Sequence, residues 1–272
     1  MVHEPLPIDL DLVEKTALGA AHRACGILKQ YFGHATVVRK KGEIDLVTQA
    51  DPASEKAILE TILGTFPDHV ILGEEGGRVG DEKSSPFTWI IDPLDGTTNY
   101  AHHIPVFAVS IAFAIEDETV FGLVVNPISG ELFMARKGQG AFLNGAPICV
   151  STTSTMRDSL LVTGFPYNLG SMVEDLMTRF ERCVRSAQGV RRYGSAALDL
   201  CFVACGRFDG FWEQNLHPWD TAAGACIVRE AGGRVTNFSL GEHSPEQKEI
   251  IATNGRIQDA LAALLDLGKD KR

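Results

Sequence analysis

Residues 89–100, "WIIDPLDGTTNY", run from an apolar stretch into two aspartates that a proline and a leucine separate. The apolar residues predict a buried strand, and Pro93 has no N–H for a sheet, so we expect the strand to end there. Asp92 and Asp95 then emerge at the carboxyl edge of a sheet, where open α/β folds bind ligands. Two carboxylates in such a place repel one another and lose hydration, so the pattern predicts a positive partner for them.

The glycine and threonines that follow, Gly96, Thr97 and Thr98, are expected at a helix N-terminus. Free backbone N–H groups and the helix dipole favour an anion such as phosphate there. One segment therefore offers carboxylates for a hard cation and amides for an anion, which is what metal-assisted phosphate chemistry needs. Taken alone, the segment also fits a plainer interpretation, with Asp95 as an N-cap and Asp92 as a surface acid.

Two further segments place acids just after an apolar run or at a helix start. Glu74 and Glu75 follow the apolar part of "VILGEEGG", and Asp220 follows Trp219 in "HPWDTAAG". Read singly, these acids are a solvated turn and an ordinary N-cap. Three acidic junctions in one chain favour a shared site instead.

The bulk properties are those of an ordinary globular protein. The chain has 272 residues, 44% of them hydrophobic, and a net charge of −10, which argues against a broad nucleic-acid footprint. The start, "MVHEPLPIDLDLVEK", lacks the pattern of a signal peptide, and no apolar window is long enough for a membrane span. The six cysteines form no CxxC pair and are expected to be mostly small buried thiols. We therefore expect a cytoplasmic protein.

Hydrophobic periodicity predicts an α/β fold in which helices cover sheets, with a weak boundary around 140–158. A Gly-rich polar loop is expected over 73–85, and a hairpin turn at "NPISG". Asp51 and Pro52 are expected to open the second helix, with the aspartate as its cap. The expected helices are 8–32, 51–63, 172–186, 195–206, 218–231 and 256–267, and the expected strands are 87–91, 106–115, 119–125, 131–136, 159–163, 189–192, 208–213, 234–236 and 249–253.

Three other phosphate-binding or nucleotide-binding patterns do not fit. Haloacid-dehalogenase phosphatases carry D-x-D-G-T after a strand, whereas this chain has D-x-x-D-G-T, which displaces the second acid. No Walker A loop is present. The stretch "GQGAFLNG" lies in a β-rich region and lacks the third glycine of a dinucleotide fingerprint.

The motifs together resemble the inositol monophosphatase family, and in detail its bacterial inositol-1-monophosphatases. The resemblance rests on "DLVTQAD" (45–51), "GEE" (73–75), "WIIDPLDGTTNY" (89–100) and "HPWDTAAGACIVREAGG" (217–233). Their order and spacing fit as well, and "ELFMARKGQGAFLNG" and "YGSAALDL" extend the match over nearly the whole chain. The fold that this implies is an αβαβα sandwich of the sugar-phosphatase type. We expect a single domain of two packed halves, about 1–150 for metal and phosphate and about 151–272 for substrate.

The resemblance also implies a set of metal ligands for two to three Mg²⁺ ions. Glu74, Asp92 and the backbone carbonyl of Leu94 would hold the first ion. Asp92 would bridge to a second ion, which Asp95 and Asp220 complete, and Glu74 would contribute to a weaker third.

Catalytic and substrate-binding roles follow from the same resemblance. Asp51 would pair with Thr97 to orient and deprotonate a metal-activated water, with Glu74 as the third catalytic residue. The residues implied to bind substrate are Gly96 and Thr97, through their amides to phosphate, and Ser195, Ala196, Glu213 and Asp220, toward the sugar or cyclitol hydroxyls. Asp51 beside Pro52 also fits a plain helix start, and both interpretations can hold together.

The match departs from the family in two places. Animal members carry "TELGSS" where this chain has "TGFPYN" (163–168), which puts the substrate contacts there in doubt. The lysine of the first loop corresponds either to Lys40 or to Lys41, and the sequence does not choose between them.

The sequence therefore favours a Mg²⁺-dependent phosphomonoesterase acting on inositol 1-phosphate. Fructose 1,6-bisphosphate, histidinol phosphate and 3′-phosphonucleotides are alternative substrates that the shared motifs do not separate, although Glu213 favours vicinal hydroxyls. A regulatory protein that touches the transcription machinery is the other class, but the intact acid set argues for catalysis. Homodimer formation and lithium sensitivity are family expectations, and we expect no direct contact with nucleic acid or membrane.

Overall fold

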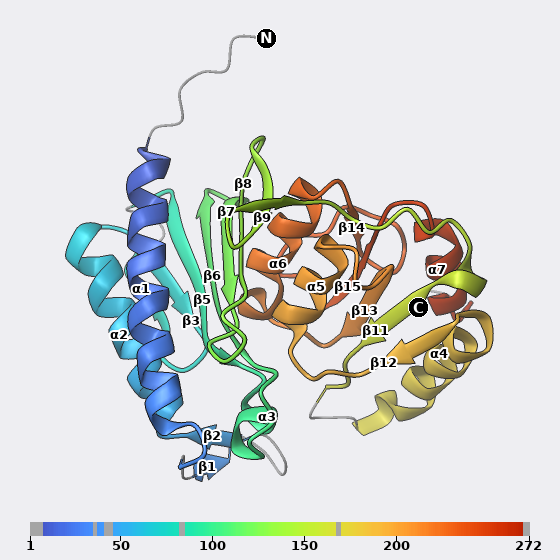
Figure 1. The fold of residues 1–272 in the computed structure, drawn as a ribbon, viewed down its shortest axis with the longest axis horizontal. Coiled ribbons are helices and arrows are strands. Elements are labelled where there is room, and N and C mark those ends of the chain that lie inside the picture. The colour runs from blue at the N-terminus through green and yellow to red at the C-terminus, as the bar shows by residue number, and fades with distance from the viewer. Residues whose placement is uncertain (1–7, 35–36, 41–45, 82–84, 167–169, 269–272) are drawn as a thin grey trace.

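The computed structural model describes residues 8–34, 37–40, 46–81, 85–166 and 170–268, and its elements form five alternating layers (Figure 1). Helices α1 (Leu10–Tyr31) and α2 (Ala50–Thr65) cover one face of an eight-stranded sheet. Helices α5 (Ala196–Ala204) and α6 (Pro218–Glu230) lie between this sheet and a five-stranded one. Helices α4 (Val173–Ser186) and α7 (Gln258–Leu265) cover the outer face of the second sheet. The predicted αβαβα sandwich is confirmed.

The eight-stranded sheet has the order β10-β9-β8-β7-β6-β5-β3-β4, and only β3 and β5 pair in parallel. Helices on both faces explain why β5, β6 and β7 read as continuous apolar runs. The strands are β3 (Val70–Gly73), β4 (Gly77–Val79), β5 (Phe87–Asp95), β6 (Ala108–Ile115), β7 (Glu118–Val125), β8 (Leu132–Arg136), β9 (Gly140–Leu143) and β10 (Ala146–Ile148).

The five-stranded sheet has the order β12-β11-β13-β15-β14, with β11 parallel to both of its neighbours. Its strands are β11 (Leu160–Thr163), β12 (Gly189–Arg191), β13 (Gly210–Gln214), β14 (Arg234–Thr236) and β15 (Glu249–Thr253). The remaining elements are a small pair, β1 (Val37–Lys40) and β2 (Leu46–Thr48), the short helix α3 (Thr97–Ala101) and two single turns, Met156–Asp158 and Gly170–Met172.

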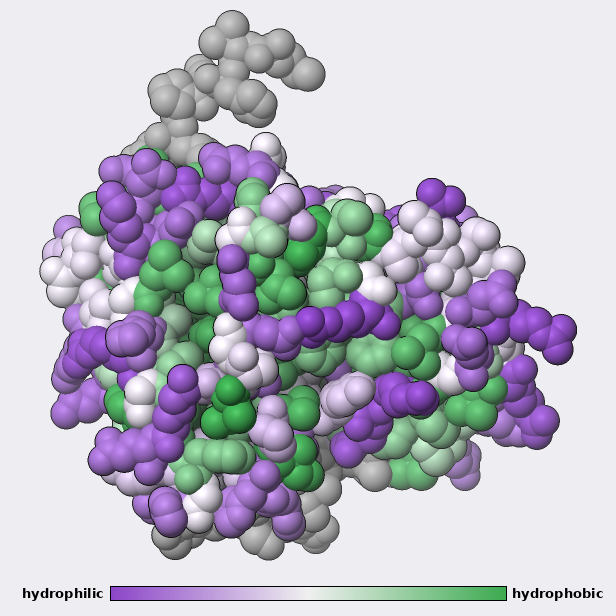
Figure 2. Space-filling view, in the orientation of Figure 1, coloured by the Kyte–Doolittle hydropathy of each residue, from purple (hydrophilic) through white to green (hydrophobic). Residues whose placement is uncertain are grey.

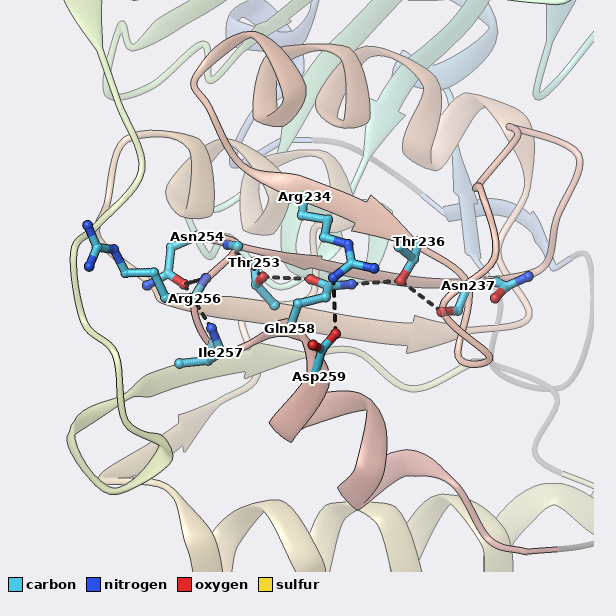
Figure 3. A network of polar contacts seen from close by, with 10 residues as sticks. Arg234, Thr236, Asn237, Thr253, Asn254, Arg256, Ile257, Gln258 and Asp259 are labelled. Atoms are coloured by element: carbon cyan, nitrogen blue, oxygen red, sulfur yellow. Dashed lines mark hydrogen bonds and ion pairs between the residues drawn. The ribbon is translucent and has the colours of Figure 1, made fainter.

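Helix α7 is joined to the second sheet by a buried polar network, drawn in Figure 3. The fully buried Gln258 donates from Nε2 to Thr236 Oγ1 at 2.6 Å, and its Oε1 accepts from Thr253 Oγ1 at 2.6 Å. Thr253 Oγ1 in turn accepts from Gly255 N at 2.9 Å. Both ends of the Gln258 amide are therefore satisfied inside the protein. We call this group the Gln258 network.

Three buried apolar clusters lie between successive layers. Helix α6 crosses β7 closely, because a side chain at Gly122 would come within 2.6 Å of Ala223 O. Figure 2 shows hydrophilic residues around the rim of one face and apolar residues nearer its middle. Within the described ranges, every helix is too short or too polar to cross a lipid bilayer.

Several sequence predictions need correction. The strand does not end at Pro93: β5 runs on to Asp95, and its register against β6 shifts between Asp92 and Asp95. This irregularity takes up the missing N–H of the proline. Strand β4 lies inside the predicted 73–85 loop, and β9 and β10 were not predicted. Of the cysteines, Cys183, Cys201 and Cys226 are buried as expected, but Cys149 is exposed.

Candidate active site

A cavity of about 370 Å³ opens where the end of β5 and the starts of α3, α5 and α6 meet. We call it the acid-lined cavity, because carboxylates from both halves of the chain face it. All predicted site residues except Asp51 line this cavity: Glu74, Asp92, Leu94, Asp95, Gly96, Thr97, Ser195, Ala196, Glu213 and Asp220. The fold thus brings together residues that lie up to 146 positions apart in the sequence (Glu74 to Asp220).

Asp92 lies at the irregular end of β5, and it is almost completely buried. Its Oδ1 accepts a hydrogen bond from Leu94 N at 2.9 Å. Burial raises the pKa of Asp92 well above its ordinary value, and the charges of Glu74, Asp95 and Asp220 raise it further. The interpretation of Asp92 as a surface acid is therefore wrong.

Asp95 reaches across to the other half of the molecule. Its Oδ2 accepts from Ala197 N at 2.9 Å and from the Ser195 hydroxyl, both at the N-terminus of α5. The N-cap of α3 is Gly96, so the interpretation of Asp95 as an N-cap is wrong as well. Burial raises the pKa of Asp95 to about 6, although the bonds from Ser195 and Ala197 oppose that rise.

Asp220 stands in the first turn of α6, and its Oδ2 accepts from His217 N at 2.7 Å. Burial, together with the charge of Asp95, raises the pKa of Asp220 well above its ordinary value. Asp92, Asp95 and Asp220 therefore share one arrangement, in which a backbone N–H holds one carboxylate oxygen. A carboxylate can accept further ligands at its second oxygen, so this arrangement fixes the orientation and still allows binding.

Glu74 reaches the same edge of the sheet by a different route. It follows β3, which pairs in parallel with β5 so that Gly73 lies opposite Ile91. The next residues along the two strands, Glu74 and Asp92, are therefore neighbours. This explains how Glu74 of "GEE" and the two aspartates of "DPLD", which no sequence spacing connects, come to line one cavity.

Asp51 lies behind Thr97 and does not line the cavity. The Thr97 hydroxyl is 3.3 Å from Asp51 Oδ1 and 3.0 Å from Leu94 O, so the predicted Asp51–Thr97 pair is formed. Asp51 Oδ2 accepts from Thr48 N at 2.9 Å and from Thr48 Oγ1 at 2.6 Å. Burial raises the pKa of Asp51 to about 6.

The prediction that Asp51 caps α2 is wrong. Gln49 is the N-cap, and the helix begins at Ala50. The Asp51 carboxylate turns back to the preceding Thr48, where it satisfies a backbone N–H outside the helix.

Gly96 must be a glycine in this backbone. Its φ is +90°, and a Cβ there would lie 3.0 Å from Val106 O and 3.1 Å from Gly194 O. The N-cap residues of α3, α5 and α6, which are Gly96, Ser195 and His217, all line the cavity. Helix N-termini carry partial positive charge, so they offset part of the negative charge of the acids.

Glu213, on β13, sits tightly against the backbone of Gly164. A Cβ at position 164 would come within 2.1 Å of Glu213 Oε2, so the carboxylate keeps its place only because that residue has no side chain. Burial, and then the charge of Asp95, raises the pKa of Glu213 to about 8. In the segment whose contacts the sequence left in doubt, Phe165 and Pro166 line the cavity.

Several residues that line the cavity were not predicted from the sequence. Arg192 stacks its guanidinium over Phe165 at 5.2 Å, and His217 stacks on Trp219 at 4.8 Å. The "HPWD" motif already contained His217 and Trp219, whereas nothing in the sequence ties Arg192 to the site. The choice between Lys40 and Lys41 falls outside the described side chains.

Asp199 was also missed, and it lies just behind the site on α5. It is fully buried, and neither of its carboxylate oxygens has a hydrogen-bond partner among the residues that the structure describes. Burial, followed by the charge of Glu213, raises the pKa of Asp199 well above its ordinary value. The sequence feature that could have revealed Asp199 is a lone acid inside the apolar run "AALDLCFVA".

The donor set fits a hard divalent cation. In the described part of the chain, no group of three or more His, Cys, Asp and Glu side chains is already arranged to coordinate a metal ion. The raised pKa values of Asp92 and Asp220, which burial and neighbouring acids cause, nevertheless mark an uncompensated negative charge. Carboxylate and carbonyl oxygens are the ligands that Mg²⁺ takes, and such an ion would remove the repulsion among them.

The five-layer fold brings acids and helix N-termini to one cavity, which is the arrangement that cation-assisted phosphate chemistry requires. The model of the inositol monophosphatase family matches residues 9–268. An inositol-1-monophosphatase of Synechocystis is 46% identical over 260 residues, which is 95% of this chain and 90% of that protein. The chain belongs to the inositol monophosphatase family.

Two further comparisons show how closely the fold and the sequence agree. The structure of an inositol monophosphatase from Anabaena superimposes with a TM-score of 0.86 at 42% identity, covering 95% of this chain and 96% of that one. The Nus factor SuhB of Escherichia coli is 40% identical over 249 residues, or 91% of this chain and 93% of that protein. The family consists of phosphatases that use divalent metal ions, generally Mg²⁺.

Proposed function

We propose that this protein is a Mg²⁺-dependent phosphomonoesterase that hydrolyses inositol 1-phosphate to inositol and phosphate. The observation that carries the proposal is the convergence of Glu74, Asp92, Asp95 and Asp220 on one cavity that helix N-termini also face. The inositol-1-monophosphatase of Synechocystis supports the choice of substrate. Glu213 supports it too, because a buried carboxyl can accept hydrogen bonds from neighbouring polyol hydroxyls.

Two to three Mg²⁺ ions are proposed for the cavity. Glu74, Asp92, the carbonyl of Leu94, Asp95 and Asp220 would hold them. When bound, the ions would neutralise the phosphate and make water a stronger nucleophile near neutral pH.

The chain's own residues would position the phosphate and take the proton. Backbone N–H groups of Gly96 and Thr97 would bind phosphate oxygens. Thr97 Oγ1 would accept a proton from the attacking water while passing its own to Asp51 Oδ1, along the 3.3 Å contact between them. The raised pKa of Asp51, about 6 because of burial, brings it closer to the range that a general base near neutral pH requires.

On the other side of the cavity, Ser195, Ala196, Glu213 and Asp220 would face the polyol. The Ser195 hydroxyl already donates to Asp95, so we propose that this residue acts mainly through the aspartate. The protein would work as one domain of two packed halves, as a cytoplasmic homodimer, and with the lithium sensitivity expected of the family.

The test is phosphate release from a substrate panel, with Mg²⁺ and with a chelator. The panel holds inositol 1-phosphate, fructose 1,6-bisphosphate, histidinol phosphate and 3′-phosphoadenosine 5′-phosphate. The proposal predicts the highest kcat/KM for inositol 1-phosphate and no turnover with chelator. A clear preference for another member would replace the substrate but keep the chemistry.

A second candidate function is regulatory, through contact with the transcription machinery. Its support is the 40% identity to proteins named Nus factor SuhB over nearly the whole chain. No turnover of any panel member by folded protein would favour this candidate over catalysis.

A further inference from the structure

Glu55 is a buried acid on α2 that does not line the cavity. It stands four residues after Asp51, so the two side chains leave the same face of the helix. Its Oε1 accepts a hydrogen bond from Glu75 N at 3.2 Å. The carboxylate therefore contacts the turn that follows β3 and carries Glu74.

The glycines of that turn leave room for the Glu55 carboxylate. A Cβ at Gly73 would lie 2.2 Å from Glu55 Oε1, and a Cβ at Gly76 would lie 3.2 Å from Oε2. The backbone on both sides of Glu74 thus packs directly against this one side chain. We call residues 73–76 the Glu74 turn.

A charge on Glu55 does not stabilise the folded protein, because the side chain is buried and lies near two other acids. Burial raises the pKa of Glu55, and although backbone N–H groups of the Glu74 turn lower it, the charges of Glu75 and Glu74 raise it again. A neutral side chain of similar size would avoid the desolvation and the repulsion. The acid therefore calls for an explanation beyond packing.

The neighbouring residues on the same turn of α2 point to that explanation. Ser54 Oγ donates to Pro93 O at 2.9 Å, at the irregular end of β5. Asp51 Oδ1 accepts from Thr97. A single turn of α2 therefore contacts the Glu74 turn, the Asp92–Asp95 segment and Thr97, which are three separate parts of the site.

We propose that Glu55 is a positioning residue that holds the Glu74 turn so that the Glu74 carboxylate faces the acid-lined cavity. It acts on cation binding through Glu74 and touches neither substrate nor cation. This inference rests on the proposed function, because the cation is the Mg²⁺ proposed for that cavity. Outer residues that orient metal ligands typically change metal affinity by about 10–100-fold when they are removed.

The test is Mg²⁺ binding to metal-stripped full-length protein by isothermal titration calorimetry. Glu55→Ala should bind Mg²⁺ at least about tenfold more weakly than wild type. Glu55→Gln keeps an oxygen that can accept from Glu75 N but sets its amide N–H group against the second backbone N–H of the turn, so its affinity should lie between those of wild type and Glu55→Ala. The control is Glu60→Ala, which removes an exposed acid of the same helix that pairs with Arg23. This variant should bind Mg²⁺ with the affinity of wild type.

Gly73→Ala approaches the same contact from the other side, and it serves if Glu55→Ala does not fold. Its methyl group must displace Glu55 Oε1, so Mg²⁺ affinity should fall as it does in Glu55→Ala. Equal Mg²⁺ affinity in wild type and Glu55→Ala, or in wild type and Gly73→Ala, would overturn the positioning role. So would a Glu55→Gln protein as weak as Glu55→Ala. Wild-type protein that binds Mg²⁺ but hydrolyses no panel member would instead contradict only the proposed function.

Discussion

The Gln258 network and the acid cluster around Asp92 are both buried and polar, yet their partners differ in kind. In the network, each end of the Gln258 amide meets a threonine hydroxyl of the protein. In the acid cluster, Asp92, Asp95 and Asp220 face one another across a cavity, and backbone N–H groups hold only part of each carboxylate. The first region is neutral and complete, whereas the second carries several like charges.

The difference separates groups that serve folding from groups that serve binding. A satisfied neutral network stabilises the fold and needs nothing from outside the chain. Buried like charges raise one another's pKa and lower stability until a cation joins them. Substitutions in the two regions should therefore have opposite consequences for stability and activity.

The largest effect is expected from Asp92→Asn. The change removes a carboxylate that the proposed cations share, so Mg²⁺-dependent turnover should fall by about a thousandfold or more. The metal-stripped protein should be at least as stable as wild type, because one of several repelling charges is gone. Steady-state rates and the thermal midpoint measured together check both statements, and a variant with wild-type rates would refute the site assignment.

The next effect is a pH dependence of stability that Asp51 causes. Burial raises the pKa of Asp51 from 3.8 to about 6, so the folded state binds its proton more tightly than the unfolded state. This contribution to stability is complete below about pH 4 and is lost as pH rises through 6. The unfolding free energy of metal-stripped wild type, relative to Asp51→Asn, should fall by roughly 2 kcal/mol between pH 4 and pH 7.

Urea unfolding of both proteins at several pH values measures this difference. Asparagine keeps an oxygen that can accept from Thr48 N, so it is a suitable reference that does not titrate. If the difference in unfolding free energy between the two proteins stayed constant from pH 4 to pH 7, the raised pKa of Asp51 would be contradicted.

Gln258→Leu should show the opposite pattern from Asp92→Asn. It removes one hydrogen-bond partner each from Thr236 and Thr253 inside the fold, and should lower the unfolding free energy by about 2 kcal/mol. The kcat should not change. The control is Arg234→Gln, which breaks the exposed ion pair with Asp259 and should cost about 0.5 kcal/mol or less. A large loss of kcat in Gln258→Leu would show that the two regions are not independent.

The smallest effect is expected from Ser195→Ala, which removes the hydroxyl that donates to Asp95. Loss of this orienting bond should lower kcat about tenfold. Ser195 is also the N-cap of α5, so stability should fall by about 1 kcal/mol. Ser195→Thr keeps a hydroxyl and should restore most of the kcat and most of the stability. Equal kcat in wild type and Ser195→Ala would show that Asp95 does not need the hydrogen bond from Ser195.

Much of the fold could be predicted because its elements carry strong local signals. The continuous apolar runs of β5, β6 and β7 predicted strands buried on both faces. The alternating helices and strands after residue 159 match the structure to within a few residues at each end. Strands β4, β9 and β10 were missed because they are short and mostly polar or half-exposed, so neither length nor periodicity marks them.

The candidate site was predicted less evenly. Motif resemblance placed Glu74, Asp92, Asp95 and Asp220 together, and they line one cavity. The contacts that orient them were not predictable, because they join residues far apart in the chain. Ser195 lies 100 residues from the Asp95 that it orients, and Glu55 lies 20 residues from Glu75. Such pairs follow from the packing of α2 and α5, which no local pattern encodes.

The most direct test of the account is the initial rate of phosphate release from inositol 1-phosphate by metal-stripped wild-type protein, as Mg²⁺ is added back. The account predicts no release without the cation and a rate that rises with Mg²⁺ until it saturates. A rate that is the same with Mg²⁺ and with chelator would contradict it, because the acid cluster would then have no cation to explain it.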